Sequence, residues 1–393
     1  MSDENQQTGP VPHEKILRSH EGGKLSVVPT SPLGTLRDLS VAYTPGVAEV
    51  SRAVAADPAT ASTHTWAGRL VAVVSDGSAV PGLGDVGPAA ALPVMEGRAA
   101  LFKAFADLDA IPLVLDTRDV DEIVRTVQVL RPSFGAVDLA AVSAPRCFEI
   151  EQRLIEELDV PVMHDDQHGT AVVVLAALLN AAQLVGKDLS GLKVVVAGAG
   201  AAGIATTEIL LAQGVEDVVL MDSRGIVSRE RDDLDAIKAD CAARTNPRGL
   251  IGGPKDALEG ADVLVGVSGE RIPEEFLTEL AEDAVVFALA DPDPEVVPDV
   301  AAKHAAVVAT GRSDFPNRIT EVLAFPGIFR GVLDAGARRI TPAMKLEAAR
   351  ALAAIAAADG LTAEHIVPSA LDPRVVPAVA DAVAACGRTG ATG

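Results

Sequence analysis

The chain has 393 residues, of which 49% are hydrophobic and 22% are charged, and its formal net charge is −22. This length is sufficient for two domains, and the hydrophobic content excludes a largely disordered protein. The negative charge disfavours nucleic acid and anionic membrane surfaces as partners, because both repel an acidic protein. The cysteines Cys147, Cys241 and Cys386 are scattered, which indicates neither a disulfide framework nor a zinc site.

The N-terminal residues 1–12 are polar and are predicted to be a disordered lead. They lack the apolar stretch of a signal peptide. The longest apolar run, 171–182, is too short to span a bilayer and predicts a buried helix. We therefore expect a cytoplasmic protein with no membrane partner.

Strands and helices alternate in the first part of the chain. A short helix is expected at 13–20, and the stretch 76–88 is expected to be a loop. The predicted strands are 69–75, 111–115, 136–142 and 160–162, and the predicted helices are 93–106, 119–130 and 146–158. Such alternation is typical of parallel strands with crossover helices, so an N-terminal α/β domain is expected at 13–162.

The same alternation continues after a long apolar helix, predicted at 170–184, and a linker at 186–191. The predicted strands are 193–197, 217–222, 262–267, 284–289 and 306–310, and the tail at 341–393 is expected to be helical with breaks at Pro368, Pro373 and Pro377. This pattern predicts a doubly wound, Rossmann-like domain at 163–393.

A glycine-rich loop, GAGAAG at 198–203, joins the strand at 193–197 to the following helix. Gly198 allows the tight turn, Gly200 allows a pyrophosphate to approach, and Gly203 lets the helix pack on the sheet. The backbone amides of Ala201 and Ala202, at the start of the helix, can bind the phosphates.

Asp222 ends the next predicted strand. There, its carboxylate can accept hydrogen bonds from both ribose hydroxyls and would repel a 2′-phosphate. The position therefore favours NAD over NADP, although Arg224, two residues later, leaves NADP open.

Short motifs along roughly residues 13–335 occur in an order that resembles one family. They are YTPGVA (43–48), GLGDVG (82–87), PVMEG (93–97), APRCFEIE (144–151), DDQHGT (165–170), GAGAAG (198–203) and FPGIFRG (325–331). The chain resembles the malic enzymes of the short bacterial type. The resemblance implies a malic-type substrate domain, an NAD-binding domain with Ser268 on the nicotinamide side, and a homodimer or larger assembly.

The resemblance also implies a reaction, in which malate is oxidised with NAD(P) and then decarboxylated to pyruvate with the help of a divalent metal. Tyr43 matches the family's proton donor. The family's lysine base is replaced by Arg98, and a guanidinium cannot be deprotonated in a protein. Lys103, five residues later, would face another side of the helix.

The family's metal ligands are replaced as well. Its Leu-Glu-Asp reads Leu139-Ala140-Ala141 here, which leaves Asp165 and Asp166 as a weak or vestigial pair and disfavours bound Mg²⁺ or Mn²⁺. In a strand, Asp138 would lie a full pleat, roughly 6.6 Å, from Ala140.

Two substrate-binding asparagines of the family are replaced by Asp291 and Glu321. A carboxylate can only accept hydrogen bonds and repels the carboxylates of malate. Because five changes converge on one chemical step, ordinary malate decarboxylation is not expected.

Three readings stay open. In an NAD oxidoreductase with an altered substrate, Arg98 would anchor a carboxylate, while Asp291 and Glu321 would face a cationic group such as an amine. In a non-catalytic partner subunit or NAD-responsive regulator, Arg98 would pair with Asp291 or Glu321. The third reading is a conventional NAD-dependent malic enzyme that uses substitute residues.

Overall fold

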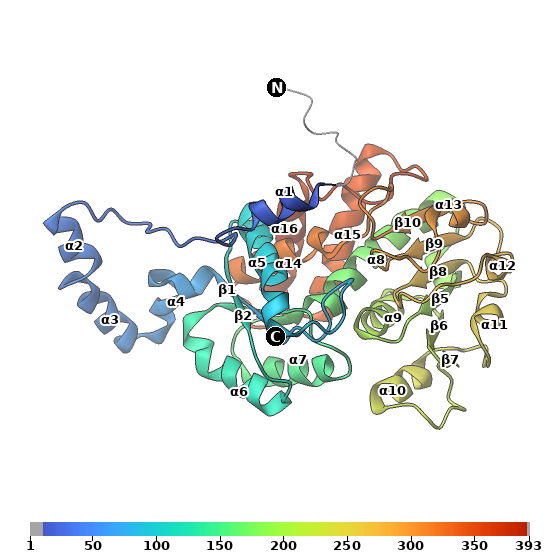
Figure 1. Cartoon of the computed structure of the whole chain (residues 1–393), viewed down its shortest axis with the longest axis horizontal. Helices are drawn as coiled ribbons and strands as arrows, with labels where there is room; N and C mark the ends of the chain where they lie inside the picture. The colour runs from blue at the N-terminus through green and yellow to red at the C-terminus, as the bar shows by residue number, and fades with distance from the viewer. Residues whose placement is uncertain (1–10, 391–393) are drawn as a thin grey trace.

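Two parallel β-sheets, each covered by helices, make up most of the protein (Figure 1). This computed structural model describes residues 11–390, so most of the predicted disordered lead lies outside the described residues. The first sheet has the strand order β2-β1-β3-β4 and the second has the order β10-β9-β8-β5-β6-β7. Only β7 is antiparallel to its neighbour, which confirms the predicted α/β class with a doubly wound second sheet.

The strands of the first sheet are β1 (Leu70–Ser75), β2 (Asp109–Val114), β3 (Ala136–Leu139) and β4 (Val162–His164). Those of the second are β5 (Lys193–Ala197), β6 (Asp217–Asp222), β7 (Gly225–Ile226), β8 (Val263–Gly266), β9 (Val285–Ala288) and β10 (Val307–Thr310). Nearly every residue of β1, β3, β5 and β9 is buried, as expected for parallel strands covered on both faces.

Helices connect the strands and form the tail. In the first half they are α1 (His13–Ser19), α2 (Leu36–Ala42), α3 (Gly46–Ala56), α4 (Ala61–His64), α5 (Gly87–Ala106), α6 (Val120–Leu130), α7 (Arg146–Glu157) and α8 (Asp165–Val185). In the second half they are α9 (Ala201–Gln213), α10 (Ala236–Arg244), α11 (Pro254–Leu258), α12 (Glu274–Leu277), α13 (Pro298–Ala301), α14 (Phe325–Asp334), α15 (Pro342–Asp359) and α16 (Val375–Gly390). Short 3-10 turns lie at Pro58–Thr60, Trp66–Arg69, Arg131–Ser133, Leu189–Gly191 and Glu321–Leu323.

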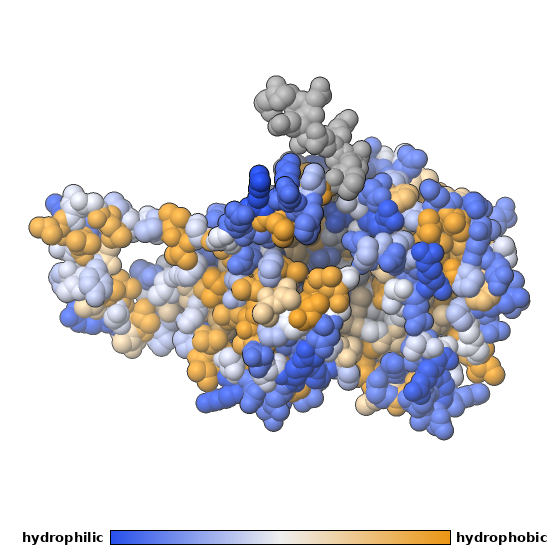
Figure 2. All heavy atoms as spheres, in the orientation of Figure 1, coloured by the Kyte–Doolittle hydropathy of each residue, from blue (hydrophilic) through white to orange (hydrophobic). Residues whose placement is uncertain are grey.

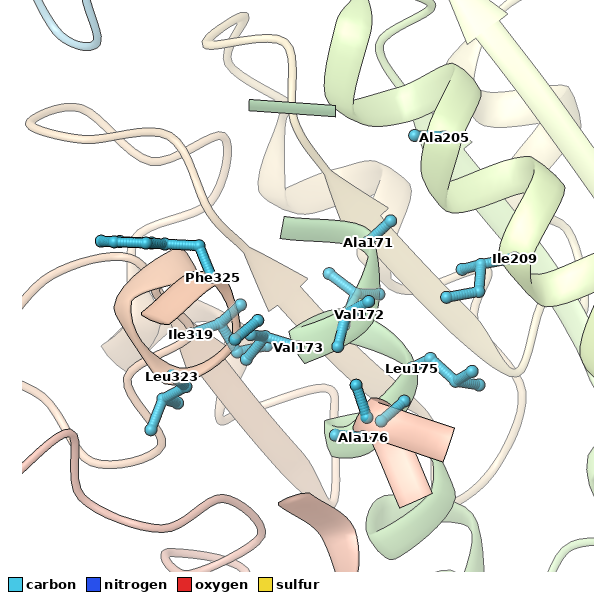
Figure 3. Packing of buried hydrophobic residues seen from close by; sticks show 14 of the residues in the cluster. Ala171, Val172, Val173, Leu175, Ala176, Ala205, Ile209, Ile319, Leu323 and Phe325 are labelled. Atoms are coloured by element: carbon cyan, nitrogen blue, oxygen red, sulfur yellow. The ribbon is translucent and has the colours of Figure 1, made fainter. Parts of the chain in front are cut away.

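Helix α8 is the central element of the larger core. Figure 3 shows Val172 and Val173 of α8 facing Ile319 and Phe325 on one side, with Ala205 and Ile209 of α9 beyond the other side. By length and hydropathy, α8 is the single described helix that could cross a membrane, but most of its apolar window is buried inside the protein. Its apolar character is thus explained by the core, as the sequence predicted.

Helices α2, α3 and α4 form an arm, residues 30–65, that projects from the rest of the chain (Figure 1). None of these helices has a buried residue. Leu36, Val41 and Tyr43 are 84%, 71% and 69% exposed, and apolar atoms gather along the arm in Figure 2. The sequence analysis did not predict these helices, because their apolar residues mark no face that this chain buries.

Several element boundaries differ from those predicted. Helix α8 begins at Asp165 rather than at residue 170, so the DDQHGT motif forms its first turns. Helix α5 begins at Gly87 and passes through Pro93. Pro377 does not break the tail as predicted, since it lies in the first turn of α16, where proline leaves no hydrogen bond unmade.

Candidate functional site

Arg98, on α5, lies at the centre of a buried ion cluster and is only 8% exposed. Its Nε donates a hydrogen bond to Asp138 on β3, and its Nη2 donates to the second carboxylate oxygen of Asp138 at 3.3 Å. Nη2 also forms an ion pair with Asp165, the first residue of α8. The ring of Phe325 covers the guanidinium, with Cζ 4.3 Å from the ring centroid. The guanidinium is therefore enclosed on several sides.

Burial and charge compete within this cluster. Burial lowers the pKa of Arg98, but the fields of Asp138 and Asp165 outweigh it and hold the pKa well above its usual value. Burial raises the pKa of Asp138 to about 6 and also raises the pKa of Asp165. Buried carboxylates are costly unless they are paired, so Arg98 is the cation that allows both to lie in the core.

The oxygen atoms near Arg98 do not fit a divalent metal. Mg²⁺ needs oxygen ligands in a near-octahedral array, and Ala140 and Ala141 offer only methyl groups. Asp165 is engaged by Arg98, while Asp166 accepts a hydrogen bond from the backbone amide of Ala141 at 2.7 Å. Within residues 11–390, no three His, Cys, Asp or Glu side chains are grouped so that they could hold a metal ion.

Ala141 has an unusual backbone conformation, with φ of +55°. Alanine is disfavoured in this left-handed region, where aspartate and asparagine are better tolerated. Its amide and carbonyl are both used, by Asp166 and by the amide of Ala79 at 3.1 Å. The backbone is thus held in a conformation that its side chain does not favour.

The glycine loop after β5 has the geometry that its sequence predicts. Gly198 has φ of +128°, and a Cβ placed on Gly203 would lie 1.6 Å from the carbonyl oxygen of Gly198. A Cβ on Gly200 would meet no atom within 4 Å, and Gly200 lines the cleft. Helix α9 begins at Ala201, so the free amides of its first turn lie beside this loop. These residues fit the diphosphate of a dinucleotide.

The turn after β8 is fixed by Glu295, which the sequence analysis missed. Its Oε1 accepts hydrogen bonds from the amides of Ser268 and Gly269 at 2.7 and 2.8 Å, and its Oε2 accepts one from Ala290 at 3.3 Å. Glu295 is 1% exposed. One carboxylate therefore ties together the turns that follow β8 and β9, on the side of the cleft predicted for nicotinamide.

Asp222 lies in the nucleotide cleft but is not free. Arg231 binds both of its carboxylate oxygens, at 2.7 and 3.1 Å, and Lys238 binds one of them at 2.9 Å. Although burial acts to raise it, these hydrogen bonds lower the pKa of Asp222 to about 2. The nearby Arg224 pairs with Asp233. Three cations, Arg224, Arg231 and Lys238, and two carboxylates, Asp222 and Asp233, therefore lie where the adenosine ribose is expected. Their formal charge is +1, so this region should not strongly reject a 2′-phosphate.

A cleft of about 750 Å³ is lined both by the nucleotide loop and by Asp291 and Glu321, the two predicted substrate positions. Its walls include Gly200, Ala201 and Ala202 at one end and Asp166, Asp291 and Glu321 at the other. Asp166 and Glu321 also line a second cavity of about 480 Å³, which contains Arg98, Ala140 and Ala141. Of the predicted site residues, these two cavities bring together Arg98, Asp166, Gly200, Ala201, Ala202, Ser268, Asp291 and Glu321. Gly198 and Asp222 line an adjoining cavity that shares Gly200 and Ser268 with the large cleft. Tyr43, Gly203 and the fully buried Asp165 line none of these three cavities.

Comparison with known proteins agrees with this architecture. Residues 22–155 match the family profile "Malic enzyme, N-terminal domain", and residues 167–386 match "Malic enzyme, NAD binding domain". The chain belongs to the malic enzyme family. The predicted family and fold are confirmed.

Individual malic enzymes are closely similar to this chain. The NAD-dependent malic enzyme of Geobacillus stearothermophilus is 52% identical over 96% of this chain and 79% of its own length. The NADP-dependent malic enzyme of Rhizobium meliloti is 46% identical over 92% of this chain and 50% of its own. The solved NAD-dependent malic enzyme of Thermotoga maritima is 45% identical, with a TM-score of 0.91 over 95% of this chain and 99% of its own.

The family position of the proton donor, Tyr43, lies apart from the other site residues. It is on the arm and is not among the described residues that line the Arg98 cavity or the large cleft. Lys103 pairs with Asp107 at 2.6 Å and with Asp109 at 3.1 Å, so it faces away from the Arg98 cluster, as predicted.

The expected partners of Arg98 were wrong. The sequence suggested an external carboxylate, Asp291 or Glu321, whereas Arg98 pairs with Asp138 and Asp165. Nothing in the sequence pattern indicated that the long side chain of Arg98 reaches across to Asp138 on β3.

A second buried network lies at the start of α8, next to the Arg98 cluster. Glu151 of α7 accepts hydrogen bonds from the backbone amide of His164 at 2.7 Å and from the side chain of Gln167 at 3.0 Å. The ring of His168 lies 3.0 Å from it. Although burial acts to raise it, His168 lowers the pKa of Glu151 to about 2. Glu151 therefore anchors the first turns of α8, and with them Asp165 and Asp166.

Proposed function

We propose that this chain is an NAD-binding member of the malic enzyme family that does not carry out metal-dependent oxidative decarboxylation of malate. One observation carries the proposal. The buried guanidinium of Arg98 occupies the space between Asp138 and Asp165, so a cation that cannot act as a base stands at the family's base position.

Three further features support the same function. Ala140 and Ala141 remove two metal-ligand positions, and Asp291 and Glu321 place negative charge where malate would need hydrogen-bond donors. The glycine loop, by contrast, fits a dinucleotide. NAD would supply a hydride acceptor when bound, and Gly198–Gly203 with the turn at Ser268 would hold it.

The second candidate is a conventional NAD-dependent malic enzyme. The names of the relatives favour it, since proteins up to 52% identical are named malic enzymes. NADP also stays open, because some of the relatives are named NADP-dependent.

One assay separates the two candidates. Formation of NADH or NADPH from L-malate is followed with Mn²⁺, with the Geobacillus stearothermophilus enzyme as a positive control. We expect turnover at least about a thousandfold below an ordinary enzyme rate, which is on the order of 10 per second. Turnover near that ordinary rate would establish the conventional activity and overturn the proposal. Isothermal titration with NAD in the same preparation shows separately whether the nucleotide cleft is functional.

We also propose a homodimer or larger assembly, supported by the exposed apolar residues of the arm. Such a patch is costly in water and is typical of a protein–protein contact. Analytical ultracentrifugation at micromolar concentration tests this, and a monomer at all concentrations would refute it.

A further inference from the structure

The large cleft carries an excess of negative charge. Four carboxylates line this cleft, those of Asp166, Asp291, Asp293 and Glu321, and Arg318 is the one cationic side chain among the described lining residues. The formal charge of the lining is therefore −3. The Nε of Arg318 donates a hydrogen bond to the carbonyl oxygen of Gly311, which lines the same cleft, at 3.1 Å.

The Arg98 cluster does not compensate this charge. Arg98 is shared by two carboxylates, those of Asp138 and Asp165, and is enclosed beneath Phe325. The cluster as a whole thus adds no positive charge to the cleft. Glu321 lies next to this cluster. A Cβ placed on Gly169 would be 1.9 Å from the Oδ1 of Asp165 and 3.1 Å from the Cβ of Glu321, so both side chains pack against the same point of α8.

These carboxylates lie in the same cleft as the nucleotide loop. The cavity that contains Asp222 and the large cleft share Gly200, Val267 and Ser268. A dinucleotide with its adenosine ribose at Asp222 and its diphosphate at Gly200 would extend its other half toward Ser268 and the carboxylates. The end of the cleft that would receive the nicotinamide is therefore the acidic end.

We infer that these carboxylates make the cleft selective for the oxidised cofactor over the reduced one. The nicotinamide ring of NAD⁺ is cationic, whereas that of NADH is neutral, and the rest of the two molecules has the same charge. A carboxylate a few ångströms from the ring attracts the first and not the second. This inference rests on the proposed nucleotide binding and specifies its redox selectivity: the protein binds NAD⁺ in preference to NADH.

The test is direct binding of NAD⁺ and NADH, measured by isothermal titration in the same buffer. We expect NAD⁺ to bind on the order of tenfold more tightly than NADH. The double variant Asp291→Asn with Glu321→Gln keeps the shape of both side chains and removes two charges. It should lower the preference to below about threefold, mainly by weakening NAD⁺, while NADH affinity changes little. Circular dichroism and thermal unfolding establish that the variant is folded.

A matched control is Glu156→Gln, which removes one charge from an exposed position on α7, where Glu156 accepts a hydrogen bond from Gln152. It should leave the preference unchanged. The preference should also shrink as salt is raised, because the interaction is electrostatic.

Equal or tighter binding of NADH, or a preference that survives the double variant, would overturn the redox inference while leaving nucleotide binding intact. Failure of both nucleotides to bind would instead overturn the proposed function, and the inference with it.

Discussion

The nucleotide end of the cleft and its acidic end, taken here together with the adjoining Arg98 cavity, are constrained by different forces. At the nucleotide end, Gly198 and Gly203 are required by the backbone itself, because a side chain at Gly203 would overlap the carbonyl of Gly198. In the adjoining Arg98 cavity, Ala140 and Ala141 are buried, but the backbone does not require alanine there, because Ala141 has a positive φ that alanine does not favour.

This difference separates what the fold needs from what a reaction needs. A position under steric constraint keeps its residue whether or not chemistry takes place, so the glycine loop alone is weak support for an activity. A position under chemical constraint is free to change once the reaction is gone. The acidic end of the cleft is therefore the informative one, and experiments should act on it first.

The largest expected effect comes from restoring the acidic end as a unit. The variant Arg98→Lys, Ala140→Glu, Ala141→Asp, Asp291→Asn and Glu321→Asn should gain malate-dependent NADH formation with Mn²⁺ of at least about a hundredfold over the unmodified chain. Single restorations should stay silent, because base, metal ligands and substrate donors act together. Full activity from one single restoration would show that the other positions were not limiting.

Removing the internal cation should strongly destabilise the fold. Arg98→Ala leaves Asp138 and Asp165 buried without a partner, and we expect a loss of about 3–5 kcal/mol in the free energy of unfolding. Urea denaturation measures this loss. Combining Arg98→Met with Asp138→Asn and Asp165→Asn should recover most of it, because no buried charge is left. If Arg98→Ala barely changes the free energy of unfolding, water must reach these two carboxylates.

The Glu151 network at the start of α8 should make part of the protein's stability sensitive to acid. Glu151 has a pKa lowered from 4.5 to about 2, so its stabilisation is fully present above pH 4.5 and is lost as the pH falls through 2. By linkage this amounts to on the order of 3 kcal/mol. Denaturation curves should therefore show a steeper fall in stability for the unmodified chain than for Glu151→Gln. If the unfolding free energies of the unmodified chain and of Glu151→Gln fall in parallel as the pH is lowered, Glu151 does not have this role.

The ribose corner of the nucleotide end can be tested through Arg231 and Lys238. Replacing both with alanine leaves Asp222 uncompensated, so NADP should weaken by about tenfold relative to NAD. Titrations of both nucleotides measure the ratio, and the unmodified chain should show only a modest preference for NAD. Asp314→Asn, an exposed change on a loop after β10, is a suitable control. A ratio that does not move would place the 2′ position elsewhere.

The smallest expected effect concerns the backbone at the acidic end. Ala141→Gly should stabilise the protein by about 1 kcal/mol, because glycine adopts positive φ without steric cost. The same change at Ala140, whose φ is not positive, should be destabilising. Thermal unfolding of the two variants compares them, and equal effects would mean that the strain at Ala141 is relieved in solution.

Sequence reasoning was most successful where one local rule decides the outcome. The spacing of Gly198, Gly200 and Gly203 after an apolar strand predicted the loop and its geometry. Strand and helix types were correct through most of both sheets, because their hydrophobic periods are long and regular.

The contacts that the sequence did not predict have a common physical cause, because they join residues that are far apart along the chain. Arg98 meets carboxylates 40 and 67 positions away in sequence, and Glu295 binds amides more than 20 residues before it. The partner of a buried charge depends on how the helices and strands pack together, and the local sequence pattern does not contain this information. The only local clue to Glu295 was an acidic residue beside two valines.

The arm has a practical consequence for anyone who studies this protein by its own fluorescence. Tyr43 lies on the arm and Trp66 at its base, and they are the only tyrosine and tryptophan in the chain. Trp66 is 40% exposed and its Nε1 donates a hydrogen bond to Asp109 at 2.6 Å. Intrinsic emission will therefore report changes around the arm, such as association on concentration. Occupation of the cleft will have to be followed by calorimetry or by the light that NADH itself emits.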